Sequence, residues 1–433
     1  MIDAAGALGG FAFLLILMFL GLPVGVAILT MSIVGAALFL GWRPVLAYGT
    51  QTWSNLNNFV LTAIPLFILL GELLLRAGLT ERMYTSLSDW VRGLPGRLLH
   101  TNVLACGLFS AVSGSSVATA ATIGTVALGD FQKRGYNERL VLGTVAAGAT
   151  LGILIPPSIN LIIYGAMTNS SIGRLFMAGV VPGLILIAVF IVAIMLLATF
   201  RPHLIGGADA VDPLAVRLRR LRFLLPPIAI FVVVMATIYL GWGTPTEAAA
   251  MGVGMALVLA AVYGRLSFAY LHEVFVSTIR LTAMILFILT AALFMNFIIG
   301  FLGVPRAMTE FVTDLGLTAL QTILVLIVFY FVLGLFMEAL AMMVATVPVI
   351  FPLIVFLGID PIWFGIFLVL MMEVALITPP MGLNLYVVQG IRGRGSINDV
   401  FLGVVPFILC MFAVVALIIV FPGVVTWLPD LMF

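Results

Sequence analysis

The sequence predicts an all-α polytopic membrane protein made of two inverted repeats. Three observations support this fold class. Hydrophobic residues make up 64% of the 433-residue chain and charged residues only 8%, whereas soluble domains are about 25% charged. Apolar runs of the length needed to cross a bilayer recur along the whole chain. Several motifs of the first half also return in the second half at nearly constant spacing.

Composition and missing motifs exclude several other classes. The net charge of +2 is too small to indicate a nucleic-acid-binding protein, and two cysteines cannot form a disulfide framework or a four-ligand metal site. The sequence contains no Walker A, His-Glu-x-x-His or Cys-x-x-Cys motif. The N-terminus lacks the basic region of a signal peptide. We therefore expect the first apolar run to be a retained span.

Ten apolar segments are expected to cross the membrane. They are 8–20, 24–41, 54–76, 139–166, 174–200, 223–240, 246–263, 278–301, 361–389 and 399–428. Two further regions, 100–129 and 316–357, are too long for one crossing and have small or polar residues in the middle, at Ser113 to Ser116 and at Gly334 to Glu338. We expect both regions to be re-entrant helical hairpins.

The basic residues predict the orientation of these segments. If both termini lie outside and each hairpin returns to its own side, 16 of the 19 Lys and Arg residues fall in cytoplasmic loops, Lys133 among them. The exceptions are Arg43, Arg174 and Arg306. An excess of Lys and Arg marks the cytoplasmic side of a membrane protein, so this topology is the one we predict.

Matching motifs divide the chain into two repeats, 1–222 and 223–433. Gly21-Leu22-Pro23 corresponds to Gly243-Thr244-Pro245 at an offset of 222 residues, and Pro156-Pro157 to Pro379-Pro380 at 223. The predicted topology gives the repeats opposite orientations, an arrangement common in secondary transporters. The alternative is chance similarity between apolar segments.

Each double proline interrupts a predicted span, because proline has no N–H to donate and cannot continue a helix smoothly. The carbonyls that lose their donors are costly in hydrocarbon unless they line a cavity or bind a cation. Gly152 and Ile155 precede the first break, and Ala375 and Thr378 the second. Their carbonyls are candidate Na⁺ ligands, and a plain packed kink is the alternative.

The middle of the first hairpin carries three hydroxyl groups, those of Ser113, Ser115 and Ser116. Hydroxyls can bind Na⁺ or a carboxylate substrate, and Gly114 permits a tight turn. The alternative is a packing face of small residues. A nucleophilic serine is less favoured, because no predicted span contains a histidine that would act as the base. In the second hairpin, Glu338 takes the corresponding place.

Acidic and amide side chains complete the candidate set. Glu72 has Arg76 one turn away as an ion-pair partner, and Glu247 lies in a first helical turn after a capping Thr244 or Thr246. Glu338 and Glu373 have no local basic partner and are expected near the site. Asn160 and Asn384 follow the two breaks and are candidate substrate contacts, or caps of freed backbone groups.

Taken together, these motifs resemble the large membrane subunit of tripartite ATP-independent periplasmic (TRAP) transporters. The resemblance rests on segments spread over residues 21–390: Ile64 to Glu72, Ser113-Gly114-Ser115-Ser116, Ile155-Pro156-Pro157-Ser158, Gly243 to Ala248 and Thr378-Pro379-Pro380. It implies import of a small organic acid, such as a C4-dicarboxylate or sialic acid, into a bacterium through the inner membrane, with Na⁺ as the coupling ion. It also implies an elevator mechanism in which hairpins and broken helices form the transport domain and the other helices a scaffold.

The family further implies two partners, a periplasmic substrate-binding protein and a small four-helix membrane subunit, which we expect to be a separate chain. Carried over by motif, the first Na⁺ site comprises Ser113, Ser115, Gly152, Ile155 and Pro157. The second comprises Glu338, Ala375, Thr378 and Pro380, and family members often have Asp in place of Glu338. The predicted substrate contacts are Ser116, Asn160 and Asn384. No catalytic residue and no transition metal are expected.

Two other functions remain open on the sequence alone. One is a single-component, ion-coupled carboxylate carrier of similar architecture. The other is a membrane-embedded hydrolase that uses Ser115.

Overall fold

The computed structural model describes residues 3–132, 134–207 and 212–432, and Lys133 lies outside these ranges. Within them the chain is helical and contains no strand, as predicted. The first half consists of α1 (Ala4–Phe19), α2 (Val24–Phe39), α3 (Arg43–Leu46), α4 (Tyr48–Leu56), η1 (Phe59–Thr62), α5 (Ala63–Arg76), α6 (Thr80–Val91), α7 (Leu98–Ser113), α8 (Ser116–Gln132), α9 (Glu138–Thr150), η2 (Leu151–Ile153), α10 (Ile159–Thr168), α11 (Ile172–Phe200), η3 (Pro202–Leu204), α12 (Leu214–Arg220) and η4 (Leu221–Phe223).

The second half contains fewer elements. It consists of α13 (Leu225–Tyr239), α14 (Pro245–Val262), α15 (Phe268–Leu302), α16 (Val304–Asp314), α17 (Ala319–Gly334), α18 (Ala339–Phe356), α19 (Pro361–Ile377), α20 (Leu383–Arg392), α21 (Ile397–Val420) and α22 (Gly423–Met432). Corresponding helices start at similar spacing. For example, α7 and α17 begin at residues 98 and 319, and α9 and α19 at 138 and 361.

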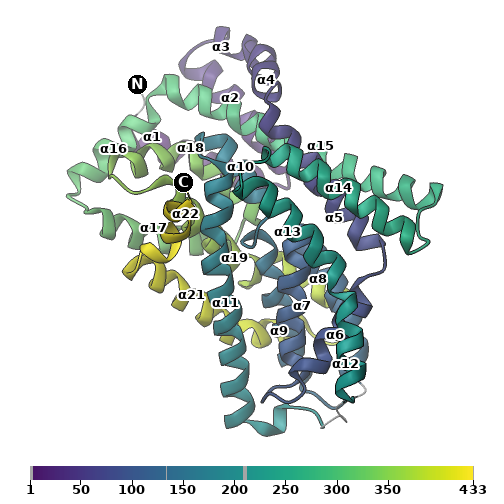
Figure 1. Ribbon diagram of the computed structural model, residues 1–433. Helices are drawn as coiled ribbons and strands as arrows, with labels where there is room; N and C mark the ends of the chain where they lie inside the picture. Colours follow the sequence, from purple (N-terminus) through teal and green to yellow (C-terminus); the bar gives the residue numbers. More distant parts are fainter. Residues whose placement is uncertain (1–2, 133, 208–211, 433) are drawn as a thin grey trace.

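In the described ranges, six helices are long and apolar enough to cross a membrane, and eight if each bent helix pair is one span. The halves of the two broken helices, such as α10 and α19, are apolar but shorter. In Figure 1, α11 runs through the molecule from α10 at the top towards the bottom, where α12 lies beside α6. At the opposite end lie α3 and α4, so the two ends of the helical bundle carry different loops.

Three predicted spans have different boundaries in the structure. The segment 54–76 divides at Asn58, whose side-chain oxygen accepts from the Val60 N–H and starts a new helical segment. The segment 399–428 divides after Phe421 at Pro422, which cannot continue a hydrogen-bonded helix. The segment 278–301 is part of a 35-residue helix, α15, which begins where Ser267 caps it. In each case a local cap or a proline, rather than hydropathy, sets the boundary.

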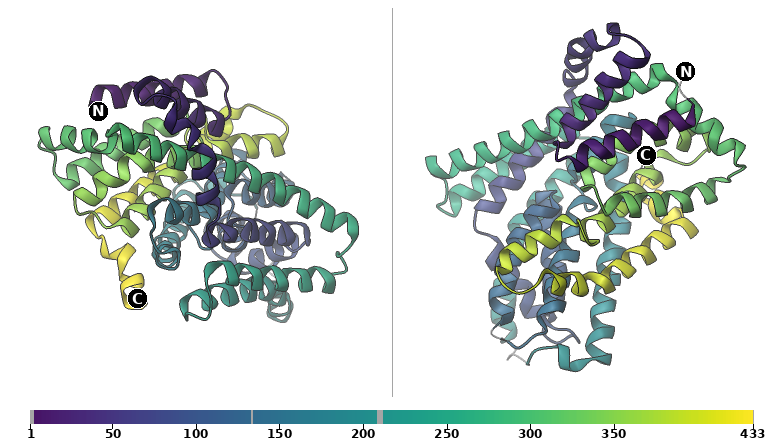
Figure 2. Two further views of the ribbon diagram at one scale, coloured as in Figure 1. Left: turned by 90° about the horizontal axis from the view of Figure 1, so that it is seen from above. Right: turned by 180° about the vertical axis from the view of Figure 1, so that it is seen from behind.

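Helices from the two halves pack on one another throughout the molecule. The view from behind in Figure 2 shows α1 and α2 lying across α15 to α18. The closest crossing joins α9 to α21, where a Cβ added to Gly143 would lie within 2.0 Å of the Gly403 carbonyl oxygen. Because only glycine fits there, the backbones of the two helices are in direct contact.

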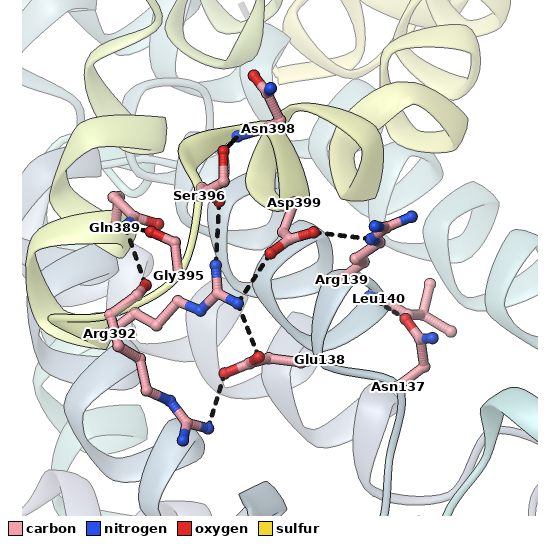
Figure 3. A network of polar contacts seen from close by, with 11 residues as sticks. Asn137, Glu138, Arg139, Leu140, Gln389, Arg392, Gly395, Ser396, Asn398 and Asp399 are labelled. Atoms are coloured by element: carbon pink, nitrogen blue, oxygen red, sulfur yellow. Dashed lines mark hydrogen bonds and ion pairs between the residues drawn. The ribbon is translucent and has the colours of Figure 1, made fainter.

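An ion-pair cluster lies at one end of this crossing and joins the helices there (Figure 3). Arg392, at the end of α20, bonds Glu138 of α9 at 2.7 Å and Asp399 of α21 at 2.9 Å. Arg139 bonds the other oxygen of Asp399 at 2.8 Å, and Arg394 bonds Glu138 at 3.1 Å. The cluster therefore ties the start of the first broken helix to the end of the second.

Candidate functional site

A cavity of about 330 Å³ lies where the two hairpin tips meet two long helices. Its volume is within the range of about 300–1,000 Å³ seen for small-molecule sites. The lining residues are Ser113, Gly114, Ser115, Ser116, Val117 and Ala118 at the first tip; Glu338, Ala339 and Leu340 at the second; Ile153, Ile159, Asn160, Leu376 and Leu383 from the broken helices; and Ile68, Gly71, Glu72, Leu75, Leu281, Met284 and Ile285 from α5 and α15. The structure thus brings together both tips and both breaks.

Four helices begin at this cavity. The first residues of α8, α10, α18 and α20 are Ser116, Ile159, Ala339 and Leu383, and each of them lines the cavity wall. A helix N-terminus carries a partial positive charge and free N–H groups, and it therefore favours an anion. The lining contains no Lys or Arg, so these helix ends are the main features that would stabilise a carboxylate.

A larger cavity, of about 430 Å³, lies between α1, α2 and α15. Its lining is apolar apart from Ser32, and the Ser32 hydroxyl donates to the Ile28 carbonyl of its own helix. It offers no group to bind a charged molecule, so the cavity between the tips is the candidate site.

The first hairpin tip packs directly on the first helix break. A Cβ added to Gly152 would lie 2.8 Å from the Ser115 carbonyl oxygen and 2.8 Å from the Ser116 nitrogen. Gly114 has a φ of +58°, and a Cβ there would lie 2.7 Å from the Pro157 carbonyl oxygen. These contacts bring Ser115, Gly152 and Pro157, three of the five predicted members of the first Na⁺ site, into one small region.

The break also frees the carbonyl that the sequence suggested. In an α-helix the carbonyl of residue i accepts from the N–H of residue i+4, so Pro156 deprives Gly152 of its donor and Pro157 deprives Ile153. The Ser158 hydroxyl donates to the Ile153 carbonyl and compensates for that loss. The Gly152 carbonyl has no such substitute among the hydrogen bonds of the loop, which leaves it suited to a cation.

Thr119 is a residue of the first tip that sequence reasoning missed. Its buried hydroxyl donates to the Ser115 carbonyl at 2.7 Å and lies 3.1 Å from the Ser113 hydroxyl. The side-chain oxygen of Ser115 accepts a long bond of 3.4 Å from the Ala118 N–H. Thr119 thus fixes the two serines, and its position one turn after Ser115 is the signal that would have identified it.

The second tip meets the second break through different atoms. A Cβ added to Gly334, at the end of α17, would lie 3.1 Å from the Ala375 Cα, so the two backbones are in close contact. Glu338 caps α18 by accepting from the Ala341 N–H at 3.3 Å, and its side chain is accessible from the cavity. The Thr378 hydroxyl donates to the Val374 carbonyl, and the Pro380 carbonyl accepts from the Tyr386 hydroxyl at 2.7 Å.

The two candidate asparagines differ in their surroundings. Asn160 lines the cavity. Asn384 is fully buried behind the first tip, where its amide nitrogen donates to the Ser116 hydroxyl at 2.7 Å and to the Ala146 carbonyl at 3.2 Å. Asn384 therefore reaches the cavity through Ser116, and not by lining it.

The structure also places the four acidic residues. Glu72 pairs with Arg76 at 3.1 Å, as predicted. Glu247 forms a capping box with Thr244, as predicted, and Thr244 rather than Thr246 is the cap. Glu373 is fully buried in α19, and neither of its oxygens has a hydrogen-bond partner in the part of the chain that the structure describes. It does not line the cavity.

Comparisons with known proteins agree with this architecture. The family described as "Tripartite ATP-independent periplasmic transporter, DctM component" matches residues 11–424. The chain belongs to this family. It is 33% identical to the C4-dicarboxylate TRAP transporter large permease protein DctM of Rhodobacter capsulatus over 439 residues, with 98% of each chain covered. It is 32% identical to the sialic acid TRAP transporter large permease protein SiaM of Vibrio cholerae over 418 residues, with 96% of each chain covered.

A solved structure of the YdaH transporter of Alcanivorax borkumensis resembles this chain with a TM-score of 0.70, covering 96% of this chain and 99% of that one. At 15% identity, this likeness concerns the fold alone. As a TRAP large permease, the protein is a multi-pass membrane transporter and not an enzyme. The hydrolase alternative built on Ser115 is therefore wrong, and Ser115 belongs to a transport protein.

Proposed function

We propose that this TRAP permease imports a small organic acid together with Na⁺ across the bacterial inner membrane. The observation that carries the proposal is the cavity at which four helix N-termini and both hairpin tips meet. A carboxylate there accepts from backbone N–H groups at the helix starts and from the side chains of Ser116 and Asn160. To donate to the substrate, the Ser116 hydroxyl gives up its bond to Asn384 Oδ1, while Asn384 Nδ2 still donates to it and holds it in position.

Sodium ions offset the charge of the substrate in this proposal. The first ion binds among Ser113, Ser115 and the carbonyls of Gly152, Ile155 and Pro157. The second binds among Glu338 and the carbonyls of Ala375, Thr378 and Pro380. Carbonyls of broken helices coordinate Na⁺ in other transporters. In the second site the carbonyls of Ala375 and Thr378 also accept from the N–H groups of Thr378 and Gly382. The free Gly152 carbonyl and its contact with the first tip support the first site more strongly than the second.

The transport step is an elevator movement. The two tips and the two breaks form one packed unit, joined across the repeats by the bond between Ser116 and Asn384. On the other side of the cavity lie α5 and α15, which pack on each other and belong to the proposed scaffold. We propose that the unit moves past α5 and α15 as a body, carrying the cavity with it, and that the two repeats are inverted in the membrane.

A periplasmic binding protein and a small four-helix membrane subunit complete the proposed transporter. The description of the family as tripartite supports two partners and argues against a single-component carrier. Relatives of nearly equal identity are named for a C4-dicarboxylate and for sialic acid. The substrate class proposed is therefore small organic acids, without a choice between these two.

Reconstitution tests the proposal. The permease is placed in proteoliposomes with its small subunit, and uptake of radiolabelled succinate and of sialic acid is measured with the binding protein outside. An inward Na⁺ gradient should drive uptake of one of these acids, and an equal K⁺ gradient should not. Uptake that persists without the binding protein, or that is equal with K⁺, contradicts the proposal.

Labelling tests the proposed topology. Cysteines are introduced at Ser171, which precedes α11, and at Ala215, which lies in the first turn of α12, beyond the other end of α11. An impermeant thiol reagent added outside whole cells should modify the cysteine at 171 and spare the one at 215. Equal labelling of both positions contradicts the topology.

A further inference from the structure

The connection between the two halves of the chain carries a dense group of positive charges. Arg217, Arg219 and Arg220 lie on α12, and Arg222 follows in η4. None of the residues of α12 is buried. The group therefore lies on the surface of the molecule, next to α6 at the lower end in Figure 1.

Only part of this charge is neutralised within the protein. Arg220 bonds Asp89 of α6 at 2.6 Å and Asp212 at 2.7 Å. Arg217, Arg219 and Arg222 have no carboxylate within ion-pair distance among residues 3–132, 134–207 and 212–432. Within these ranges, three arginines of the group therefore keep their full charge.

Aromatic rings orient several of the guanidinium groups. Arg217 lies over the Trp90 ring at 4.5 Å, and Arg222 over the Phe223 ring at 4.9 Å. Arg82 of α6 also lies over Phe223, at 5.4 Å. Stacking occupies one face of a guanidinium and leaves its edge, with its N–H groups, available to a ligand. We call Arg82, Trp90, Arg217, Arg219, Arg222 and Phe223 the arginine surface.

Apolar side chains flank the arginine surface. Leu214 is 59% exposed and Leu218 is 52% exposed. The segment Leu214–Phe223 joins α13 with a bend of 46°, and together the two are apolar enough to span a membrane. The arginines therefore lie where a spanning helix leaves the bilayer, beside leucines that are more than half exposed.

We propose that the arginine surface binds the headgroups of anionic phospholipids. Arginine forms paired hydrogen bonds to phosphate, and basic clusters next to a spanning helix attract anionic lipid. The exposed leucines enter the boundary between headgroups and acyl chains, as in helices that lie at a membrane interface. A charged polymer such as RNA would give these leucines no apolar partner, which favours a lipid over a nucleic acid.

Lipid binding here would anchor the link between the two repeats. The buried carboxylate of Asp89 bonds Arg220 on one oxygen, and Arg92 lies 3.5 Å from the other. The Ser86 hydroxyl also donates to the Arg220 carbonyl at 3.0 Å. Because these contacts fasten α12 to α6, a lipid held by the arginine surface would hold α6 at the same membrane face.

Fluorescence of Trp90 tests the proposal in nanodiscs of defined lipid. Brominated phosphatidylglycerol and brominated phosphatidylcholine with the same acyl chains serve as quenchers, and the variant W90F supplies the background to subtract. Brominated phosphatidylglycerol should quench Trp90 of the wild-type protein more strongly than brominated phosphatidylcholine. The difference in lipid affinity should be about fivefold for each arginine that contacts the headgroup. The preference should decrease at high ionic strength, because salt screens exposed charges. This measurement requires no transport, so it is independent of the proposed substrate and coupling.

The double variant R219Q/R222Q removes two of the three unpaired charges and keeps Arg217 stacked on Trp90. Its preference for phosphatidylglycerol should fall at least about fivefold, while the control R306Q, in the exposed Arg306–Glu310 pair of α16, should match wild type. Equal quenching by both lipids in the wild-type protein would overturn the proposal. If that result came with slower uptake by R219Q/R222Q, it would assign the surface to a protein partner instead.

Discussion

Ser116 and Asn384 lie 268 residues apart and bond each other through both amide atoms: the serine hydroxyl donates to Oδ1 at 2.9 Å, and Nδ2 donates back at 2.7 Å. The serine begins a helix of the first half of the chain, and the asparagine lies in the first turn of α20, after the second break. This pair therefore joins the hairpin tip of one half to the broken helix of the other.

Replacing Asn384 should weaken the whole packed unit. Asn384→Ala leaves the Ser116 hydroxyl and the buried Ala146 carbonyl without this partner, at a cost of about 1–3 kcal/mol. The thermal unfolding midpoint in detergent should fall, and so should uptake. The control is Asn398→Ala, on an exposed position of α21. If both variants unfold at the wild-type temperature, the bond contributes nothing to the fold.

Gly152 should tolerate no side chain. Gly152→Ala places a Cβ 2.7 Å from the carbonyl carbon of Ser115, against backbone atoms that cannot rotate away. Overpacking of this kind costs about 1–3 kcal/mol, and it should displace the first tip and reduce Na⁺-dependent uptake. Gly254→Ala on α14 has open space around it and should be neutral or slightly stabilising. Equal behaviour of the two variants would contradict the contact.

Ser115→Ala should change the dependence of transport on Na⁺ more than it changes folding. The Ser115 hydroxyl accepts only a long bond within the protein, so its loss costs the fold little. If the oxygen is a Na⁺ ligand, half-maximal uptake should require several-fold more Na⁺. The measurement is uptake rate against Na⁺ concentration for correctly inserted protein. An unchanged curve would mean that Ser115 only packs.

A covalent link between the moving unit and the scaffold should stop transport. Leu75 of α5 and Val117 of α8 line the same cavity from the scaffold and from the moving unit, and neither is a proposed Na⁺ ligand. In a background with Cys106 and Cys410 replaced by alanine, cysteines at these two positions are joined by a bifunctional methanethiosulfonate reagent. The link should abolish uptake while leaving Na⁺ binding as in the unlinked protein, and reductant should restore uptake. Full-rate uptake by the linked protein would exclude the elevator movement.

The ion-pair cluster of Figure 3 should stabilise the protein only above acidic pH. The hydrogen bond from Arg392 lowers the pKa of Glu138 below its ordinary value of 4.5, and the bond from Arg394 acts in the same direction. A carboxyl with a lowered pKa binds fewer protons when folded, so its stabilisation is present above pH 4.5 and is lost as the pH falls through the folded-state pKa.

Glu138→Gln removes that dependence. Between pH 5 and pH 3, the unfolding midpoint of the wild-type protein should fall more steeply than that of the variant. The exposed Glu81→Gln on α6 is the control, and it should follow the wild-type curve. Identical slopes for wild type and Glu138→Gln would show that the cluster adds no pH-dependent stability.

Local chemistry explains which parts of the fold were predictable. Gly114 between two serines predicted the first hairpin turn, and the double prolines predicted both breaks, because these residues act on the backbone where they stand. The break at Asn58 and the early start of α15 at Ser267 were not predicted, since hydropathy does not register a side-chain cap.

Contacts between distant residues could not be predicted from a single sequence. Arg392 donates to Glu138, which lies 254 residues earlier in the chain, and Asn384 donates to the Ala146 carbonyl, 238 residues earlier. The prediction placed Asn384 at the substrate because it follows a break. Its bond to Ser116 forms only when the two halves of the chain are packed together, so the sequence alone does not indicate it.

The crossing of α9 and α21 also has a consequence for how the chain is made. Arg139 and Asp399, beside the two glycines at the crossing, are 260 residues apart. At roughly 5–20 residues per second, a ribosome needs about ten to fifty seconds to synthesise the second after the first. During that interval the first half sits in the bilayer with its glycine face against lipid or against the insertion machinery. Synthesis of this protein therefore includes an interval in which α9 has no α21 to pack against, and a chain released during that interval leaves this face of α9 uncovered.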